Sequence, residues 1–130
     1  MSRSKEITPA HYNCPIDLTL DVIGGKWKPL ILWELRPGAK QFNSLHAAIP
    51  GISHKVLAQQ LRALVRQGIL DRRVRDGRVR TVSYSLSEFG RSLNPIMNSL
   101  AAWAKRHHSR LGFTLDWHPQ RHPHATHKPS

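Results

Sequence analysis

Arginine dominates one short stretch of this chain, RRVRDGRVR at residues 72–80, in which five of the nine residues are arginines. Guanidinium groups stay charged in proteins and bind carboxylates or phosphates through two parallel hydrogen bonds. The Asp76-Gly77 pair between two alternating runs predicts a β-hairpin with a two-residue turn. Such a turn places four arginines on one face in two cross-strand pairs, which are Arg75 with Arg78 and Arg73 with Arg80.

This arginine face has a physical cost, because like charges directly opposite one another destabilise a hairpin. A phosphate backbone removes that cost, since each guanidinium group gains a counter-charge and releases counterions from the nucleic acid. We therefore interpret the hairpin as a surface that binds phosphates or enters a narrow minor groove. The alternative is a highly charged hairpin that is only solvated.

The register set by the two-residue turn pairs Val74 with Val79 on the opposite face. It lets three residues continue the arginine face toward the core: Val82, Tyr84 and Leu86.

The segment before the hairpin, SHKVLAQQLRALVRQG at 53–68, has the pattern of an amphipathic helix. Ser53 is a favourable N-cap residue, and Gly68 is a favourable C-terminal stop. The apolar side chains fall on one stripe, made of Val56, Leu57, Leu61, Leu64 and Val65. The opposite face carries polar and basic side chains, which are Lys55, Gln59, Arg62 and Arg66, with His54 at the start of the helix.

This polar face has the chemistry of DNA recognition. A helix of about 14 residues fits the major groove of duplex DNA, where arginine pairs with guanine and glutamine with adenine. Arg62 is the candidate for guanine, and Gln59 or Gln60 is the candidate for adenine. Lys55 and Arg66 are better placed for phosphates. The alternative is the solvated face of an ordinary surface helix.

Other segments supply the elements that must position this helix and hairpin. A helix is predicted at about 15–24, and a second, apolar nearly all round, has Pro29 in its first turn. A short third helix, FNSLHAAIPG, ends in a tight Pro-Gly turn that suits a helix-turn-helix. The hairpin strands are expected at about 69–75 and 78–86. The fold class is therefore mainly α with a small β-hairpin.

A long helix over SEFGRSLNPIMNSLAAWAKRHHSR should follow, kinked or divided at Pro95. Its apolar stripe is Phe89, Leu93, Ile96, Met97, Leu100 and Ala104. So small a core cannot bury that stripe, and we expect this helix and the first helix to pack against their mates in a homodimer. Two recognition helices would then lie about 34 Å apart, one turn of duplex.

Composition narrows the class of protein. The chain has 130 residues, which suits one domain, and a formal charge of +12, which favours polyanionic partners. No apolar run approaches the roughly 20 residues of a membrane span, and the N-terminus lacks the apolar core of a signal peptide. One cysteine excludes an internal disulfide. We expect a cytoplasmic, nucleoid-associated protein without a cofactor.

Three further stretches carry a family resemblance: CPIDLTLDVIGGKW, FNSLHAAIPGISHKVLAQQLRALVRQGIL and VSYSLSEFGRSL. Over about 14–111 the chain resembles the HxlR-type winged helix-turn-helix regulators of bacteria. The resemblance implies a homodimeric, DNA-binding transcription regulator, expected to act as a repressor on a palindromic operator. It also implies that Ser53 caps the recognition helix and that 53–67 enters the major groove.

The resemblance covers the winged helix-turn-helix domain (14–111). Residues 1–13 are polar and without a pattern, which predicts an N-terminal arm, and 112–130 are rich in His and Pro without a period, which predicts a disordered tail. One departure concerns the hairpin. The family often has prolines in the second wing strand, where this chain has Val79 and Arg80. Because proline cannot donate to a strand ladder, we expect a more regular hairpin here.

Cys14 matches the position where some members of this family sense oxidants or electrophiles. A helix N-terminus stabilises an anionic group, and the thiolate is the reactive form of cysteine. His11 is close in sequence, whereas the negative charge of Asp17 would disfavour a thiolate. The alternative is a small apolar residue near the dimer interface. A sensor would respond to an oxidant or a small-molecule effector.

The nine histidines invite a metal interpretation, above all in the tail, at His118, His122, His124 and His127. Their flexible spacing predicts no specific metal site.

An enzyme would need a nucleophile with an orienting base. Cys14 with His11 is the only thiol pair available, so no enzyme is expected. The alternative function is a winged-helix module for RNA or protein contacts without sequence-specific DNA reading.

Overall fold

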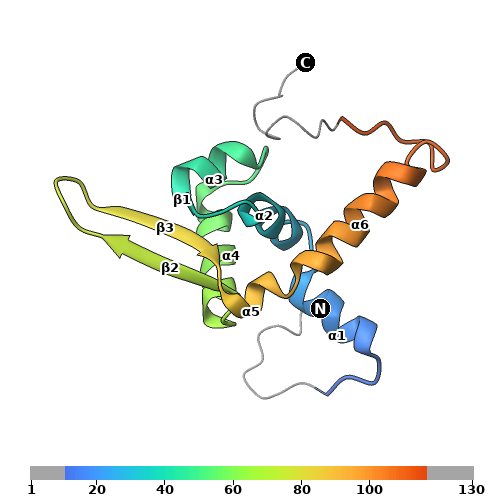
Figure 1. The fold of residues 1–130 in the computed structure, drawn as a ribbon, viewed down its shortest axis with the longest axis horizontal. Coiled ribbons are helices and arrows are strands. Elements are labelled where there is room, and N and C mark those ends of the chain that lie inside the picture. Colours follow the sequence, from blue (N-terminus) through green and yellow to red (C-terminus); the bar gives the residue numbers. More distant parts are fainter. Residues whose placement is uncertain (1–10, 117–130) are drawn as a thin grey trace.

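The computed structural model of the chain describes residues 11–116. Its elements are α1 Pro15–Ile23, α2 Lys28–Leu35, β1 Lys40–Gln41, α3 Phe42–Ala48, α4 His54–Arg66, β2 Leu70–Arg75, β3 Thr81–Leu86, α5 Glu88–Arg91 and α6 Asn94–His107. The strands form one antiparallel sheet in the order β1-β3-β2. Figure 1 shows the β2–β3 hairpin projecting from a helical body. The predicted architecture is confirmed, and residues Lys40 and Gln41, just before the short third helix, add β1 as a third strand that pairs with β3.

The core lies where α2, α3 and α4 meet the base of the sheet. Its fully buried side chains include Ile31, Leu32, Leu35, Leu45, Leu57, Leu61 and Leu64. In α2, which is apolar nearly all round, Leu30 is 43% exposed and Trp33 is half-buried, so two of its apolar side chains lie partly at the surface. After α4, Gly68 adopts a left-handed conformation (φ 78°), and the Ile69 amide donates to the Leu64 carbonyl. This C-terminal turn directs the chain from α4 straight into β2.

The predicted register of the hairpin is wrong. Arg75 pairs with Thr81, and Arg73 pairs with Ser83, so residues 76–80 form a longer loop in place of a two-residue turn. Arg78 and Arg80 lie in that loop and do not face Arg75 and Arg73. The arginine strip across both strands is therefore absent from the structure.

The apolar faces show why this register is preferred. Leu70 pairs with Leu86, and both are buried, while Val74 pairs with Val82 and not with Val79. Side chains alternate along a strand, so a shift by an odd number of residues moves every side chain to the other face. Tyr84 consequently lies with the leucines on the core side, on the face opposite Arg73 and Arg75.

Pro95 divides the C-terminal helix, as predicted. It occupies the first turn of α6, and α5 ends shortly before it. Ser87 caps α5 by accepting from the Gly90 amide, and its hydroxyl reaches the Gly68 and Ile69 carbonyls. A Cβ on Gly90 would lie 2.1 Å from the Ile69 carbonyl oxygen. This close approach ties α5 to the base of the hairpin. Of the predicted tail, residues 117–130 lie outside the described part.

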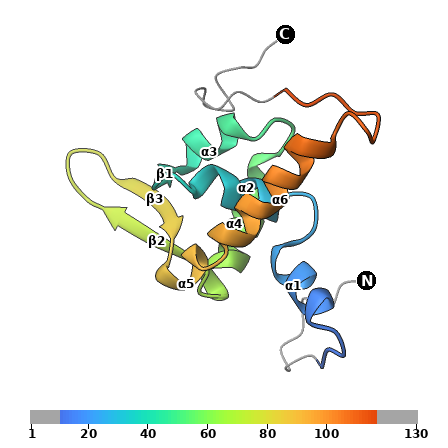
Figure 2. The ribbon, with the colours of Figure 1, turned by 45° about the vertical axis from the view of Figure 1, so that its right-hand side comes forward.

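Figures 1 and 2 place α1 and α6 on the side of the molecule away from the hairpin tip. Both helices leave large apolar side chains exposed in the single chain, which are Ile16, Leu18, Leu20, Ile96, Leu100 and Trp103. Only Met97 of the predicted α6 stripe is buried. Among the described residues, no helix has the length and apolar character that a membrane crossing requires.

Candidate nucleic-acid interface

The N-terminus of α4 is built around Ser53. Its backbone is extended, and its side-chain oxygen accepts a hydrogen bond from the Val56 amide at 3.1 Å. Such a cap satisfies one of the amides that the first helical turn leaves without a partner. The predicted start of the amphipathic helix is confirmed, and His54 and Lys55 at this end are exposed.

The polar face of α4 is exposed along its whole length. Lys55, Gln59, Arg62 and Arg66 are all exposed, and their spacing places them on one stripe. Leu57, Leu61 and Leu64 on the opposite face are buried, which fixes the rotation of the helix about its own axis. Burial of one face therefore holds the four polar side chains outward.

His54 has a contact that the sequence pattern did not reveal. Its ring stacks on His46 of α3 with centroids 3.8 Å apart, and Phe42 lies on the same stack at 5.7 Å. The two histidines belong to consecutive helices, so their contact joins α3 to the start of α4. His54 consequently has a structural role in addition to the predicted role at the DNA surface. The helical position of His46, on the face toward α4, was the available signal.

The arginines of the hairpin fall into two groups. Arg73 and Arg75 project from the same face of β2, opposite Ser83 and Thr81. Arg78 and Arg80 lie in the loop, where the Arg80 Nε is 3.9 Å from the Asp76 Oδ1 and both side chains are largely exposed. Such an exposed pair stabilises little in water, so a phosphate can replace Asp76 at low cost. All four predicted wing arginines remain accessible.

Arg72 is a candidate that the predicted register had left aside. It pairs with Tyr84 on the inner face of the hairpin. Together with Arg62, Val65 and Arg66 of α4, these two side chains line a hollow of about 220 Å³. The signal in the sequence was an arginine two residues after Leu70, which places both side chains on the same face of the strand. That this face lies toward α4 could be assigned only once the register was known.

Two other basic residues are occupied in packing. Burial lowers the pKa of Lys28, against the opposing effect of Asp21. Burial likewise lowers the pKa of Arg36, against the effect of Glu34, and the Arg36 guanidinium carbon lies 3.4 Å from the centre of the Trp33 ring. Both are therefore less free to bind a phosphate than the exposed arginines of α4 and the hairpin.

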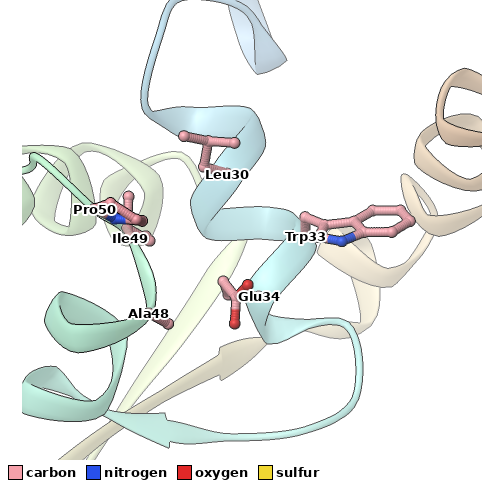
Figure 3. A pocket seen from close by; sticks show the side chains of 6 residues that line it. All are labelled: Leu30, Trp33, Glu34, Ala48, Ile49 and Pro50. Atoms are coloured by element: carbon pink, nitrogen blue, oxygen red, sulfur yellow. The ribbon is translucent and has the colours of Figure 1, made fainter. Parts of the chain in front are cut away.

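A second hollow, of about 210 Å³, lies between α2 and the turn that leads into α4 (Figure 3). Its lining consists of Leu30, Trp33, Glu34, Ala48, Ile49 and Pro50. Pockets for small molecules usually enclose roughly 300–1,000 Å³. Because this hollow is smaller, we assign no effector to it.

Cys14 is exposed and immediately precedes α1. It is the N-cap residue, and its carbonyl accepts from the Leu18 amide, but its side chain makes no capping bond. The Tyr12 hydroxyl donates to Asp21, which holds the preceding segment against α1.

Within residues 11–116, no three His, Cys, Asp or Glu side chains gather as metal ligands. The histidines of the predicted tail, from His118 onward, lie outside the described residues.

Comparisons with known proteins match this geometry. A family model described as HxlR-like helix-turn-helix matches residues 22–111. The HTH-type transcriptional regulator YybR of Bacillus subtilis is 42% identical over 105 residues, covering 81% of this chain and 84% of YybR. YtcD of the same organism is 44% identical over 100 residues, covering 77% and 79%.

Solved structures include two regulators of related fold. The redox regulator HypR in its reduced form is 40% identical, has a TM-score of 0.72 and covers 75% of this chain and 97% of its own. Diamide-treated YodB from B. subtilis is 33% identical, has a TM-score of 0.62 and covers 74% and 96%. The chain is thus similar in sequence and fold to winged-helix transcription regulators.

Proposed function

This chain belongs to the HxlR-like helix-turn-helix family of DNA-binding transcription regulators, and from that premise we propose that it acts as a homodimeric repressor on a palindromic operator. In each subunit α4 enters the major groove, and the hairpin contacts the adjacent backbone or minor groove. The observation that carries this proposal is the exposed polar stripe of α4 beside an arginine-rich hairpin. A catalytic role is no part of the proposal.

The roles within the interface follow from chemistry and position. Ser53 orders the start of α4, with His54 and Lys55 beside it near the DNA surface. Gln59 is the candidate for reading adenine, because its amide can donate and accept at one base edge. Arg66 and the four hairpin arginines, Arg73, Arg75, Arg78 and Arg80, are candidates for phosphate.

The proposed dimer uses the exposed apolar side chains of α1 and α6. Leu20 and Leu100, for example, are each more than half exposed in the single chain. Burial of such exposed apolar side chains in a subunit interface would stabilise a dimer. Because these helices lie away from the hairpin tip (Figures 1 and 2), a pair of subunits joined there can present both α4 helices to one duplex.

Selection of duplexes from a random pool tests this function. We expect an enriched palindrome with half-sites about one helical turn apart. Affinity for the selected duplex should fall steeply with salt and should exceed affinity for RNA of equal charge. No enrichment, or equal affinity for RNA, would favour the alternative of a module for RNA or protein contacts.

We further propose that Cys14 makes DNA binding sensitive to oxidants. Support comes from its exposure next to the apolar surface of α1 and from the likeness to the redox regulator HypR and to YodB, whose structure was solved after diamide treatment. In a dimer, two Cys14 thiols would lose two protons and two electrons to diamide and form one intersubunit disulfide. Alternatively, diamide would take two protons and two electrons from one Cys14 thiol and one small thiol, giving a mixed disulfide, or the Cys14 thiolate would add to an electrophile and form an adduct.

Treatment with diamide distinguishes these outcomes. The wild type should lose DNA affinity and regain it with a reductant, whereas Cys14→Ser should not respond. A dimer band on a non-reducing gel would identify the intersubunit disulfide, and a mass increase on a monomer would identify a mixed disulfide. Equal responses from both proteins would exclude Cys14 as the sensor.

A further inference from the structure

The corner between α4 and the hairpin brings three arginine side chains around one hollow. Arg62 and Arg66 come from successive turns of α4, and Arg72 comes from β2. The Tyr84 ring lies beside Arg72 as its cross-strand partner. Val65 supplies an apolar part of the lining. The site is thus assembled from two elements that only the tertiary structure brings together.

The charges of this corner are not balanced by the protein. In the described part of the chain, none of the three arginines is ion-paired with a carboxylate; the acidic residue of the nearby loop, Asp76, lies close to Arg80 instead. Like charges that converge repel one another, and an anion placed among them removes the repulsion. Guanidinium groups match a phosphate particularly well, because each can donate two hydrogen bonds to its oxygens. A phenol hydroxyl can donate one more.

The position of the corner indicates which phosphate it meets. A helix in the major groove and a hairpin at the adjacent minor groove lie on either side of one sugar-phosphate strand. The concave corner between α4 and the hairpin therefore faces that strand. An isolated surface arginine would contact any phosphate nearby, but three arginines around one hollow select a single position along the backbone.

We propose that Arg62, Arg66, Arg72 and Tyr84 form a clamp for one DNA backbone phosphate, located between the groove occupied by α4 and the groove reached by the hairpin. This inference rests on the proposed function and deepens it. It moves Arg62 from the expected guanine contact to a phosphate contact. It also adds Arg72 and Tyr84 to the interface and makes the register of the hairpin part of DNA recognition.

The clamp can be tested with the full chain, the selected duplex and three variants that each remove one exposed arginine. Arg72→Gln removes a clamp residue, and Arg73→Gln removes its neighbour on the other face of β2. Arg106→Gln removes a charge from α6, away from the hairpin. Circular dichroism and thermal melting should show that all three fold like the wild type, because none of these side chains is buried.

Salt dependence gives the first result. Arg72→Gln should weaken binding by a similar factor for every duplex sequence. It should also lower the slope of log affinity against log salt by about 1 per subunit. Arg106→Gln should leave the slope unchanged. If Arg72→Gln and Arg106→Gln behave alike, the clamp is wrong.

Methylphosphonate duplexes, in which one phosphate at a time is made neutral, locate the contact. We expect one position per half-site at which neutralising the phosphate lowers the affinity of the wild type. The same neutral phosphate should not lower the affinity of Arg72→Gln any further. Arg73→Gln should remain sensitive there, and Tyr84→Phe should weaken binding to the native duplex more than to that neutral one. If no position couples to Arg72, or if Arg73 couples at the same position, the clamp is overturned while DNA binding stands. If the wild type does not bind duplex DNA, both proposals fail.

Discussion

Leu70 lies directly opposite Leu86 at the base of the β2–β3 hairpin, and both side chains are buried. This one pair sets the face of every other side chain in the two strands, because side chains alternate between faces. It directs Arg72 inward toward α4 and Arg73 outward. The register of an exposed, charged hairpin is therefore decided by the apolar residues at its root.

Leu86→Ala should lower the free energy of unfolding by about 2–5 kcal/mol, since it removes buried methyl groups and leaves a cavity. Urea denaturation measures this loss. Val79→Ala is the matched control, because Val79 is 70% exposed in the loop and its truncation should change stability by less than about 0.5 kcal/mol. Equal losses from the two variants would mean that the pair at the base does not set the register.

Ser53→Ala should cost about 0.5–2 kcal/mol of stability, because the Val56 amide loses its acceptor. Ser53→Asp should keep the cap, since a carboxylate accepts the same bond and complements the helix dipole. Thermal melting compares the three proteins. A melting temperature for Ser53→Ala equal to that of the wild type would show that the cap contributes nothing to stability.

Gly90→Ala should destabilise the protein by about 1–3 kcal/mol, because the new Cβ would lie 2.1 Å from a backbone oxygen that cannot move alone. Gly77→Ala is the control, since a Cβ there meets nothing within 4 Å. Chemical denaturation of both variants checks the difference. A neutral Gly90→Ala would mean that α5 is not held against the base of the hairpin.

Leu100→Glu should convert the proposed dimer into a monomer, because it places a charge in the apolar face of α6. Ser99→Glu adds the same charge at an exposed polar position of the same helix and should leave the dimer intact. Sedimentation velocity at micromolar concentration distinguishes the two. A wild type that sediments as a monomer would contradict the proposed dimer at once.

Gln59→Ala should relax sequence preference at one base pair of each half-site, where a well-placed amide contributes about 1–3 kcal/mol of discrimination. Lys55→Ala should weaken binding to all duplexes alike, as expected for a phosphate contact. Repeating the selection from a random pool with each variant measures both effects. Identical selected sequences for Gln59→Ala and the wild type would remove Gln59 from base reading.

Much of the fold follows from local patterns. The apolar period placed α4 and the two helices before it, Ser53 and Gly68 marked the ends of α4, and Pro95 divided the last helix. These features depend on backbone geometry within a few residues of each position, so the chain reveals them without knowledge of its neighbours. The polar stripe of α4 followed in the same way, because the opposite face had to be buried.

The hairpin shows where local reasoning ends. Asp76-Gly77 is a strong signal for a tight turn, yet the burial of Leu70 and Leu86 outweighs it, and five residues, 76–80, form the loop. The stack of His54 on His46 and the corner that contains Arg72 also depend on contacts between separate elements. The sequence by itself determined that this protein is a basic, helix-turn-helix DNA-binding regulator. The tertiary structure decided which arginines share a face, because register depends on burial in a core that no local pattern contains.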